Sequence, residues 1–159
     1  MDIEPLEPAL WFVALKKLAD RATLMGSKQL ESLLRHGYHL LQLAPRQFRN
    51  VVKAKLPEAA FEKLLGELEF QLAAEALVGR PADFSLLELS PILFEARVSL
   101  PNQAEASVAQ ASEPAAALLR AWTQCLISLE GRPIRPQSEN SHQAQRKARS
   151  ERHLRLIER

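Results

Sequence analysis

The chain has 159 residues, of which 47% are hydrophobic and 25% charged, so it is neither wholly disordered nor a collagen-like repeat. Its single cysteine, Cys125, excludes an intramolecular disulfide framework. No apolar run approaches the ~18 residues of a membrane span, and the acidic N-terminus does not open like a signal peptide. We therefore expect a cytoplasmic protein without membrane contact, and the abundance of Leu, Ala, Glu and Arg is typical of a bacterial source.

Positive charge is concentrated in two parts of the chain. Residues 131–159 contain eight Lys and Arg but only three Glu, and residues 32–57 contain five Lys and Arg and no acidic residue. Single-sign stretches of this kind are the usual electrostatic footprint of a polyanion-binding site. A solvated face or a solubilising tail gives the same pattern, and both interpretations stay open.

The first third of the chain is predicted to be helical. Apolar residues at the 3.6-residue spacing predict helices over 8–25 and 27–43, with Ser27 as the N-cap of the second. Pro45 stops that helix and starts a third one, which runs over about 45–55. Three consecutive helices are therefore expected before the middle of the chain.

A longer amphipathic helix is predicted over 57–78, with a stripe of leucines on its apolar face. We expect Leu68 to lie in the core, so that Leu68→Ala costs about 2–5 kcal/mol. Gly79 followed by Pro81 predicts the stop, with the glycine in the left-handed conformation that ends many helices.

The periodicity changes after Asp83. Residues 92–100 alternate between apolar and polar, which predicts a half-buried strand. Residues 101–111 fit either a returning strand or an Ala/Ser-rich loop. A last helix is predicted over 113–130, and Cys125 on its apolar face is interpreted as a small core residue rather than a nucleophile.

These patterns predict a mainly α protein. We expect a compact helical domain of about five helices over residues 1–131, with one short β-strand or hairpin around 92–108. The apolar stripes of the helices should meet in one core. Residues 132–141 are predicted to be a linker, and 142–159 a basic, mobile C-terminal tail or helix.

No pattern of residues carries a recognisable catalytic signature. The sequence has no Gly-x-Ser-x-Gly elbow, and its five glycines never cluster into a phosphate-binding loop. His36 and His39 share a helical face, but no Cys, Asp or Glu in 32–57 completes a metal site. The spacing of Glu139 and His142 is interpreted as a chance match. We therefore predict a non-enzymatic protein with no metal and no cofactor.

The helix pair 27–43 and 45–55 carries the strongest functional signal. The tight break at Ala44 and Pro45 gives the pair the outline of a helix-turn-helix, and its second helix presents side chains that contact bases and phosphates. The predicted nucleic-acid-binding residues are Arg35, Arg46, Gln47, Arg49, Asn50, Lys53 and Lys55 of this pair and Arg146, Lys147, Arg149, Arg152 and Arg155 of the tail.

Two functional hypotheses follow from these patterns. The first is a small nucleic-acid-binding accessory or regulatory protein that grips phosphates with the 35–55 face and gains affinity from its tail. The alternative is an adaptor or assembly protein that docks its helical body on a larger protein complex. Salt-dependent binding separates the two. The sequence leaves open DNA versus RNA, the identity of a protein partner and the oligomeric state.

Overall fold

The computed structural model describes residues 3–24, 29–101 and 103–132. The predicted N-cap Ser27, the linker beyond Arg132 and the tail 142–159 lie outside the described residues. In chain order the elements are α1 (Pro8–Leu24), α2 (Leu30–Gln42), the 3-10 helix η2 (Arg46–Phe48), α3 (Arg49–Val52), α4 (Glu58–Gly66), α5 (Phe70–Leu77), β1 (Asp83–Ser90), β2 (Leu93–Ser99), β3 (Ser107–Ala111) and α6 (Pro114–Ile127).

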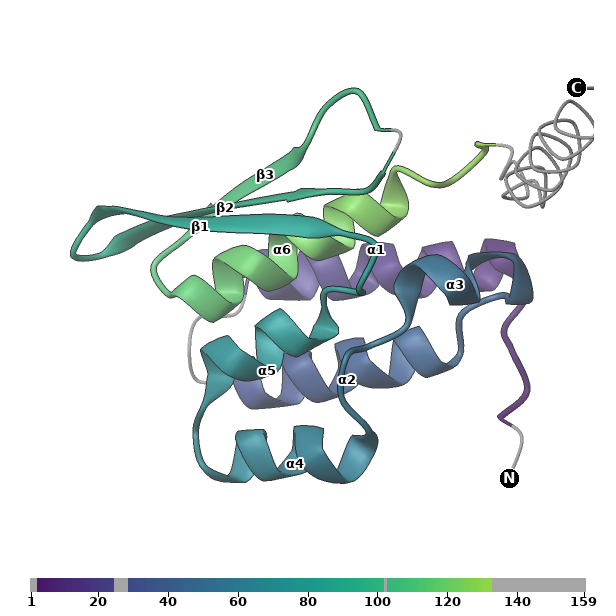
Figure 1. Ribbon diagram of the computed structural model, residues 1–159, viewed down its shortest axis with the longest axis horizontal. Coiled ribbons are helices and arrows are strands. Elements are labelled where there is room, and N and C mark those ends of the chain that lie inside the picture. The colour runs from purple at the N-terminus through teal and green to yellow at the C-terminus, as the bar shows by residue number, and fades with distance from the viewer. Residues whose placement is uncertain (1–2, 25–28, 102, 133–159) are drawn as a thin grey trace, which may run out of the picture.

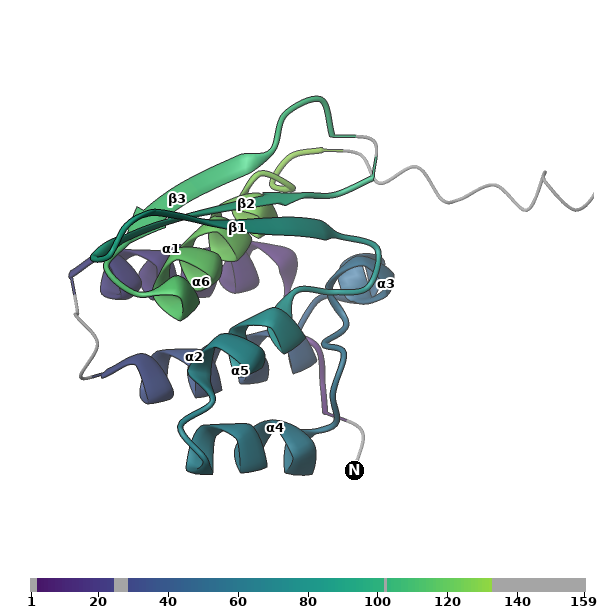
Figure 2. The ribbon, with the colours of Figure 1, turned by 60° about the vertical axis from the view of Figure 1, so that its left-hand side comes forward.

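The elements are stacked in layers (Figures 1 and 2). An antiparallel sheet of order β1-β2-β3 lies on one side of the molecule. Helix α6 packs under this sheet and contacts α1 and α5 on its other side. Helix α2 packs against α1 and α5, and α4 lies farthest from the sheet. Helix α6 is thus the central element.

The buried side chains form one cluster that joins the helices to the inner face of the sheet. Small residues such as Ala96 and Ala109 face α6 from the sheet and let the helix approach closely. Cys125 on α6 is fully buried, and burial raises the pKa of its thiol to about 11. The predictions of a single core and of a core cysteine are therefore confirmed.

The predicted fold class is wrong. Within the described residues the chain forms six α-helices and a three-stranded antiparallel sheet, not about five helices with one short strand or hairpin. Helices packed on one face of an antiparallel sheet define an α+β architecture. Residues 107–111 are a strand, which resolves the alternative left open for 101–111.

The sequence pattern reveals β2 but not β1. Strand β1 does not alternate cleanly, because the neighbouring Leu86 and Leu87 are both apolar. The turn between Ser90 and Leu93 contains only two residues, and neither is the Gly or Asn that usually marks a tight hairpin. Without alternation and without a turn signal, neither the first strand nor its turn can be predicted.

The single helix predicted over 57–78 is also wrong, because α4 and α5 are separate helices. Leu68 lies between them with a φ of 60°, and its side chain is 70% exposed. The amide of Leu68 donates to the carbonyl of Leu65 (3.1 Å), and that of Glu69 donates to Leu64 (2.9 Å). These two bonds form the Schellman motif that ends helices, normally with a glycine at the left-handed position. Leu68 is therefore not a core residue.

In the described part of the chain, no helix has both the length and the hydropathy that crossing a bilayer requires.

Candidate functional site

Arg35, the first cation of the basic stretch 32–57, is already paired. Its Nε donates to Oε1 of Glu62 and its Nη2 donates to Oε1 of Glu31, both at 2.9 Å. The guanidinium of Arg35 holds the pKa of Glu62 below its ordinary value. The two acids lie just outside the acid-free stretch, so the sequence pattern does not reveal that they neutralise Arg35.

The third predicted helix is shorter than expected. It consists of the single turn η2 and the four residues of α3, and Lys53 already has an extended backbone with φ −63° and ψ 120°. Pro57 favours an extended conformation for Leu56, and the amide of Lys55 donates to the carbonyl of Ala76 (2.9 Å). The prediction of a helix over 45–55 is therefore wrong beyond Val52, and the helix-turn-helix interpretation loses its second helix.

Residues 53–57, called the strap below, are fixed by hydrogen bonds with α5 and α2. Besides the bond from Lys55 to α5, the hydroxyl of Tyr38 on α2 donates to the carbonyl of Leu56 at 3.0 Å. Tyr38 is stacked on Phe61 of α4, with ring centroids 4.5 Å apart, and burial raises its pKa. The ammonium of Lys55 lies 5.2 Å from the ring centroid of Phe84. The strap thus presents its lysines from a positioned backbone.

Gly79 brings a further cation to the strap. A Cβ atom at Gly79 would lie 2.7 Å from the carbonyl oxygen of Val51 and 3.3 Å from that of Lys53, so only glycine allows this approach. The predicted left-handed conformation of Gly79 is wrong, because among the described glycines only Gly131 has a positive φ. The glycine is required for space, and it places Arg80 beside the strap.

A groove of about 630 Å³ lies between α2, the strap and the turn after α5. Lys53, Lys55 and Arg80 all line it, and among the described residues no acidic side chain does. Arg80 is the residue that sequence reasoning missed, because it lies outside the basic stretch and follows a different helix. The glycine directly before Arg80 hints at a close backbone approach, but the sequence does not show which segment of the chain approaches it.

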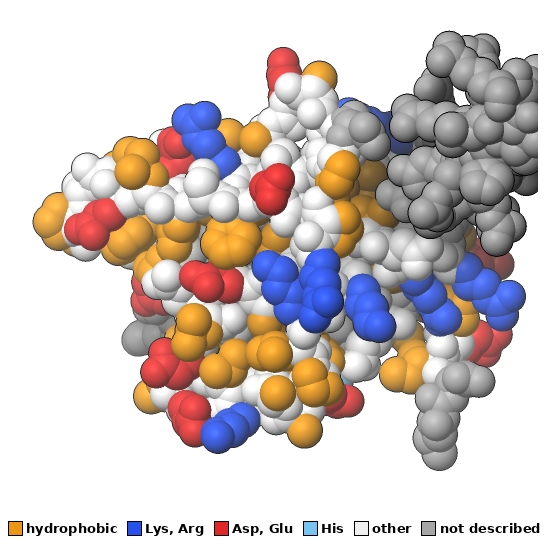
Figure 3. Space-filling model, in the orientation of Figure 1, with side chains coloured by type: hydrophobic (Ala, Val, Ile, Leu, Met, Phe, Trp, Pro, Cys, Tyr) orange, Lys and Arg blue, Asp and Glu red, His pale blue; other side chains and the backbone are white. Residues whose placement is uncertain are grey.

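The basic surface continues from the groove onto η2 and α3. Arg46 and Arg49 are exposed there, while Phe48 and Val52 anchor the segment in the core. Phe48 is stacked on Trp11, with ring centroids 5.4 Å apart. Figure 3 shows Lys and Arg side chains in a band over α3 and the segment that joins α5 to β1. We call Arg46, Arg49, Lys53, Lys55 and Arg80 the basic band.

The basic band is not neutralised by the described part of the protein. No ion pair within residues 3–24, 29–101 and 103–132 involves any of its five cations. Arg49 makes one long hydrogen bond, in which its Nη2 donates to the carbonyl of Ile3 at 3.4 Å, but this acceptor is uncharged. Gln47 and Asn50, the two predicted amide contacts, are also exposed on this segment. The structure therefore brings together all the predicted residues of 46–55.

The five predicted tail residues lie outside the described residues: Arg146, Lys147, Arg149, Arg152 and Arg155.

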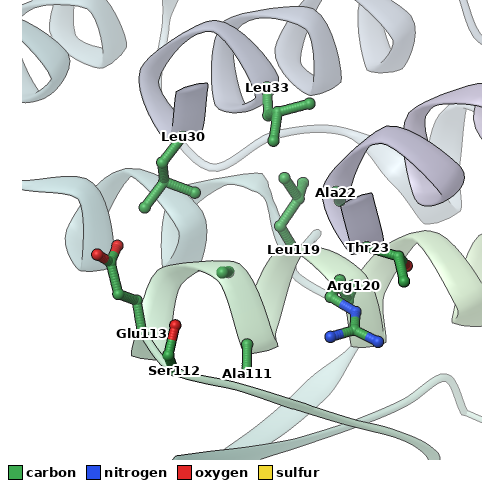
Figure 4. Close-up of a pocket in the computed structure, with 10 residues that line it drawn as sticks. Ala22, Thr23, Leu30, Leu33, Ala111, Ser112, Glu113, Leu119 and Arg120 are labelled. Carbon is green, nitrogen blue, oxygen red and sulfur yellow. The ribbon is translucent and has the colours of Figure 1, made fainter. Parts of the chain in front are cut away.

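A second cavity, of about 120 Å³, lies between α1, α2 and α6 (Figure 4). Its polar residues include Glu113 and Arg120, but Nη1 of Arg120 already donates to the carbonyl of Gln110 at 2.6 Å. The volume is well below the ~300 Å³ at which ordinary ligand pockets begin. This cavity is therefore a poorer candidate than the groove.

The histidines of α2 occupy a different environment. Nη1 of Arg21 lies 3.3 Å from Nδ1 of His36, and burial, together with the charges of Arg21 and His39, lowers the pKa of His36. A neighbouring guanidinium disfavours both a protonated imidazole and a bound cation at this position. Within the described residues, no group of three or more His, Cys, Asp or Glu side chains is placed to hold a metal ion.

Comparison with known proteins adds no assignment: no protein-family model matches the chain, and no curated protein or solved structure matches it significantly.

Proposed function

We propose that this protein is a non-enzymatic nucleic-acid-binding protein that holds the phosphate backbone of DNA or RNA along the basic band. The observation that carries the proposal is the gathering of five exposed cations from η2, α3, the strap and the turn after α5, without an acidic partner in the described residues. Cations that lie side by side raise one another's energy, so a polyanion that bridges them is stabilised.

The arrangement of the band favours a linear polyanion over a single small anion. The cations follow one another across a face of the molecule (Figure 3), as phosphates follow one another along a strand. Each Lys or Arg that contacts a phosphate releases about one condensed counterion, which makes affinity salt-dependent. Four other cations of the described residues are in ion pairs: Arg35 and Lys63, together with Lys16, which pairs with Glu130 at 2.6 Å, and Arg97, which pairs with Glu95 at 2.9 Å.

In this proposal the protein is a cytoplasmic accessory or regulatory factor, and we assign it no catalytic step. The basic tail adds sequence-independent affinity, as single-sign segments do for nucleic acids. Because α3 is a single turn, phosphate contacts and not a recognition helix provide the binding energy.

The test is a salt titration of binding to a nucleic acid by the full chain. Replacing Arg46, Arg49 and Lys53 together with Gln removes three charges and leaves the buried Phe48 and Val52 in place. We expect weaker binding and a log–log salt slope that is shallower by about two to three.

A matched control removes the same net charge elsewhere. Lys16, Lys63 and Arg97 lie on α1, α4 and β2, and each is engaged in an ion pair. Their triple replacement with Gln should leave the salt slope as in the wild type.

A tail variant, with Arg146, Lys147 and Arg149 replaced by Gln in the full chain, separates the two surfaces. If this variant abolishes binding while the band variant binds like the wild type, the band has no role and the proposal is wrong.

A specific observation favours the adaptor function as the second candidate. Apolar side chains are exposed on the β1–β2 hairpin, where Leu87, Leu89 and Ile92 are 56%, 45% and 77% exposed, and beside the α4–α5 junction at Leu68 and Leu72. Figure 1 shows this hairpin reaching beyond the helices. Exposed apolar patches of this kind mark protein-binding surfaces. The adaptor function requires that Leu87→Ser/Ile92→Ser releases a protein partner while nucleic-acid binding is unchanged.

A further inference from the structure

The groove beside the basic band is large enough to hold a molecule. Its volume of about 630 Å³ falls within the ~300–1,000 Å³ of ordinary ligand sites. The strap forms one wall, and two hydrogen bonds fix its middle: the amide of Lys55 donates to the carbonyl of Ala76, and the hydroxyl of Tyr38 donates to the carbonyl of Leu56. The cavity is therefore a preformed feature of the fold and does not depend on a free loop.

The walls of the groove have the chemistry of a nucleotide site. Ala54, Leu56 and Pro81 provide apolar surface on which the flat face of a base can lie. Asn50 and Gln42 add amide groups, which both donate and accept hydrogen bonds and can therefore read the edge of a base.

Three cations line the same groove as this apolar surface. Lys53, Lys55 and Arg80 line the same groove and carry no ion pair with any described residue. A base on the apolar wall therefore leaves its phosphate within the field of three cations, and a strand that enters the groove continues along Arg46 and Arg49 of the band.

A duplex cannot place a base in this groove, because its bases are stacked and paired and expose only their edges, not their faces. A single strand can turn one base out of its stack at small cost. We infer that the groove takes one unstacked nucleotide and that the protein therefore prefers single-stranded nucleic acid to duplex. This inference rests on the proposed function, because it specifies that the nucleic acid held by the basic band is single-stranded.

The experiment fills the groove without changing its charge. Ala54→Phe places a ring at the lining of the groove and keeps all five cations, and Ala59→Phe on the exposed side of α4 is the matched control. Binding of the full chain to a fluorescent oligothymidine and to a duplex of equal length is measured by anisotropy. Because loss of one base contact costs roughly tenfold in affinity, we expect Ala54→Phe to weaken single-strand binding about tenfold and to leave duplex binding unchanged.

A second variant keeps the test valid if Ala54→Phe does not fold. Asn50 is exposed on α3 and lines the same groove, so Asn50→Phe fills the cavity from an exposed position and does not enter the core. The same loss of single-strand preference is expected. Competition with thymidine monophosphate and with inorganic phosphate identifies the ligand: we expect the nucleotide to compete and the inorganic phosphate not to compete at equal concentration.

The outcomes separate this inference from the proposed function. If wild-type protein binds single strand and duplex equally while the Arg46/Arg49/Lys53 variant shows the expected shallower salt slope, the band binds nucleic acid and the groove inference is wrong. If inorganic phosphate competes as well as the nucleotide, the groove holds only a phosphate and the inference is again wrong. If neither nucleic acid is bound, both proposals are wrong.

Discussion

Helix α5 is bounded by two tight junctions that are built in different ways. At its start, Leu68 adopts a left-handed conformation, and the bonds that close the junction join residues no more than five apart. At its end, Gly79 lets two backbones from distant parts of the chain meet, with the carbonyl of Val51 at 2.7 Å from the position of a Cβ atom. A local junction thus tolerates a strained leucine, whereas the tertiary junction requires its glycine. Only the second junction gathers side chains from separate segments, and those side chains form the candidate site.

The largest expected effect comes from the helix that leads into the first junction. Leu65 is fully buried and Leu68 is 70% exposed, although both belong to the same leucine stripe in the sequence. We expect Leu65→Ala to cost about 2–5 kcal/mol and Leu68→Ala less than about 0.5 kcal/mol in urea denaturation. Equal losses would show that α4 and α5 form one continuous amphipathic helix.

The second expected effect concerns Gly79. A methyl group there meets backbone atoms that cannot move aside, so Gly79→Ala should destabilise the fold by about 1–3 kcal/mol. Gly66→Ala is the matched control, because a Cβ atom at Gly66, the last residue of α4, meets nothing within 4 Å. That control should gain up to about 1 kcal/mol of stability, since alanine favours helices. If Gly79→Ala leaves the stability unchanged, the two backbones do not approach closely at this position.

The third substitution is expected to raise the stability of the protein and not to lower it. Because a left-handed conformation strains any residue with a Cβ atom, Leu68→Gly should stabilise the protein by about 1 kcal/mol in thermal or urea unfolding. Glu67→Gly, one residue earlier at a φ of −87°, should instead lose stability. If Leu68→Gly destabilises the protein, the strain assigned to this junction is absent.

The smallest effect distinguishes the paired Arg35 from the unpaired cations of the band. Since Arg35 lowers the pKa of Glu62 below its ordinary 4.5, this pair adds stability above that pH, which is lost as the pH falls below it. Both side chains are more than one-third exposed, so the contribution is about 1 kcal/mol or less. Glu62→Gln should therefore be slightly less stable than the wild type at neutral pH and equal to it well below pH 4.5. A difference that persists in acid would contradict this assignment.

The sequence predicts the helical core well, because burial repeats at a period that can be read locally. The positions of Trp11, Leu15 and Leu18 follow from that period, and all three are buried. Strand β1 and the break at Leu68 escape prediction, because adjacent leucines hide the strand and a leucine occupies a position that normally holds glycine. In both places the residue type contradicts the local structure that tertiary packing selects.

The candidate site is predictable only in its local part. Arg46, Arg49, Lys53 and Lys55 share one acid-free stretch, so composition alone groups them. The pairing of Arg35 and the arrival of Arg80 depend on which helices meet, and no local pattern contains that information.

The salt dependence of nucleic-acid binding by Arg80→Gln tests the central claim most directly, because only the fold places Arg80 in the basic band. Arg97→Gln is its control, with the same charge change at a side chain that is paired with Glu95. We predict a log–log salt slope shallower by about one for Arg80→Gln and unchanged for Arg97→Gln. Equal slopes for the wild type and both variants would contradict the claim that the junction at Gly79 builds a nucleic-acid site.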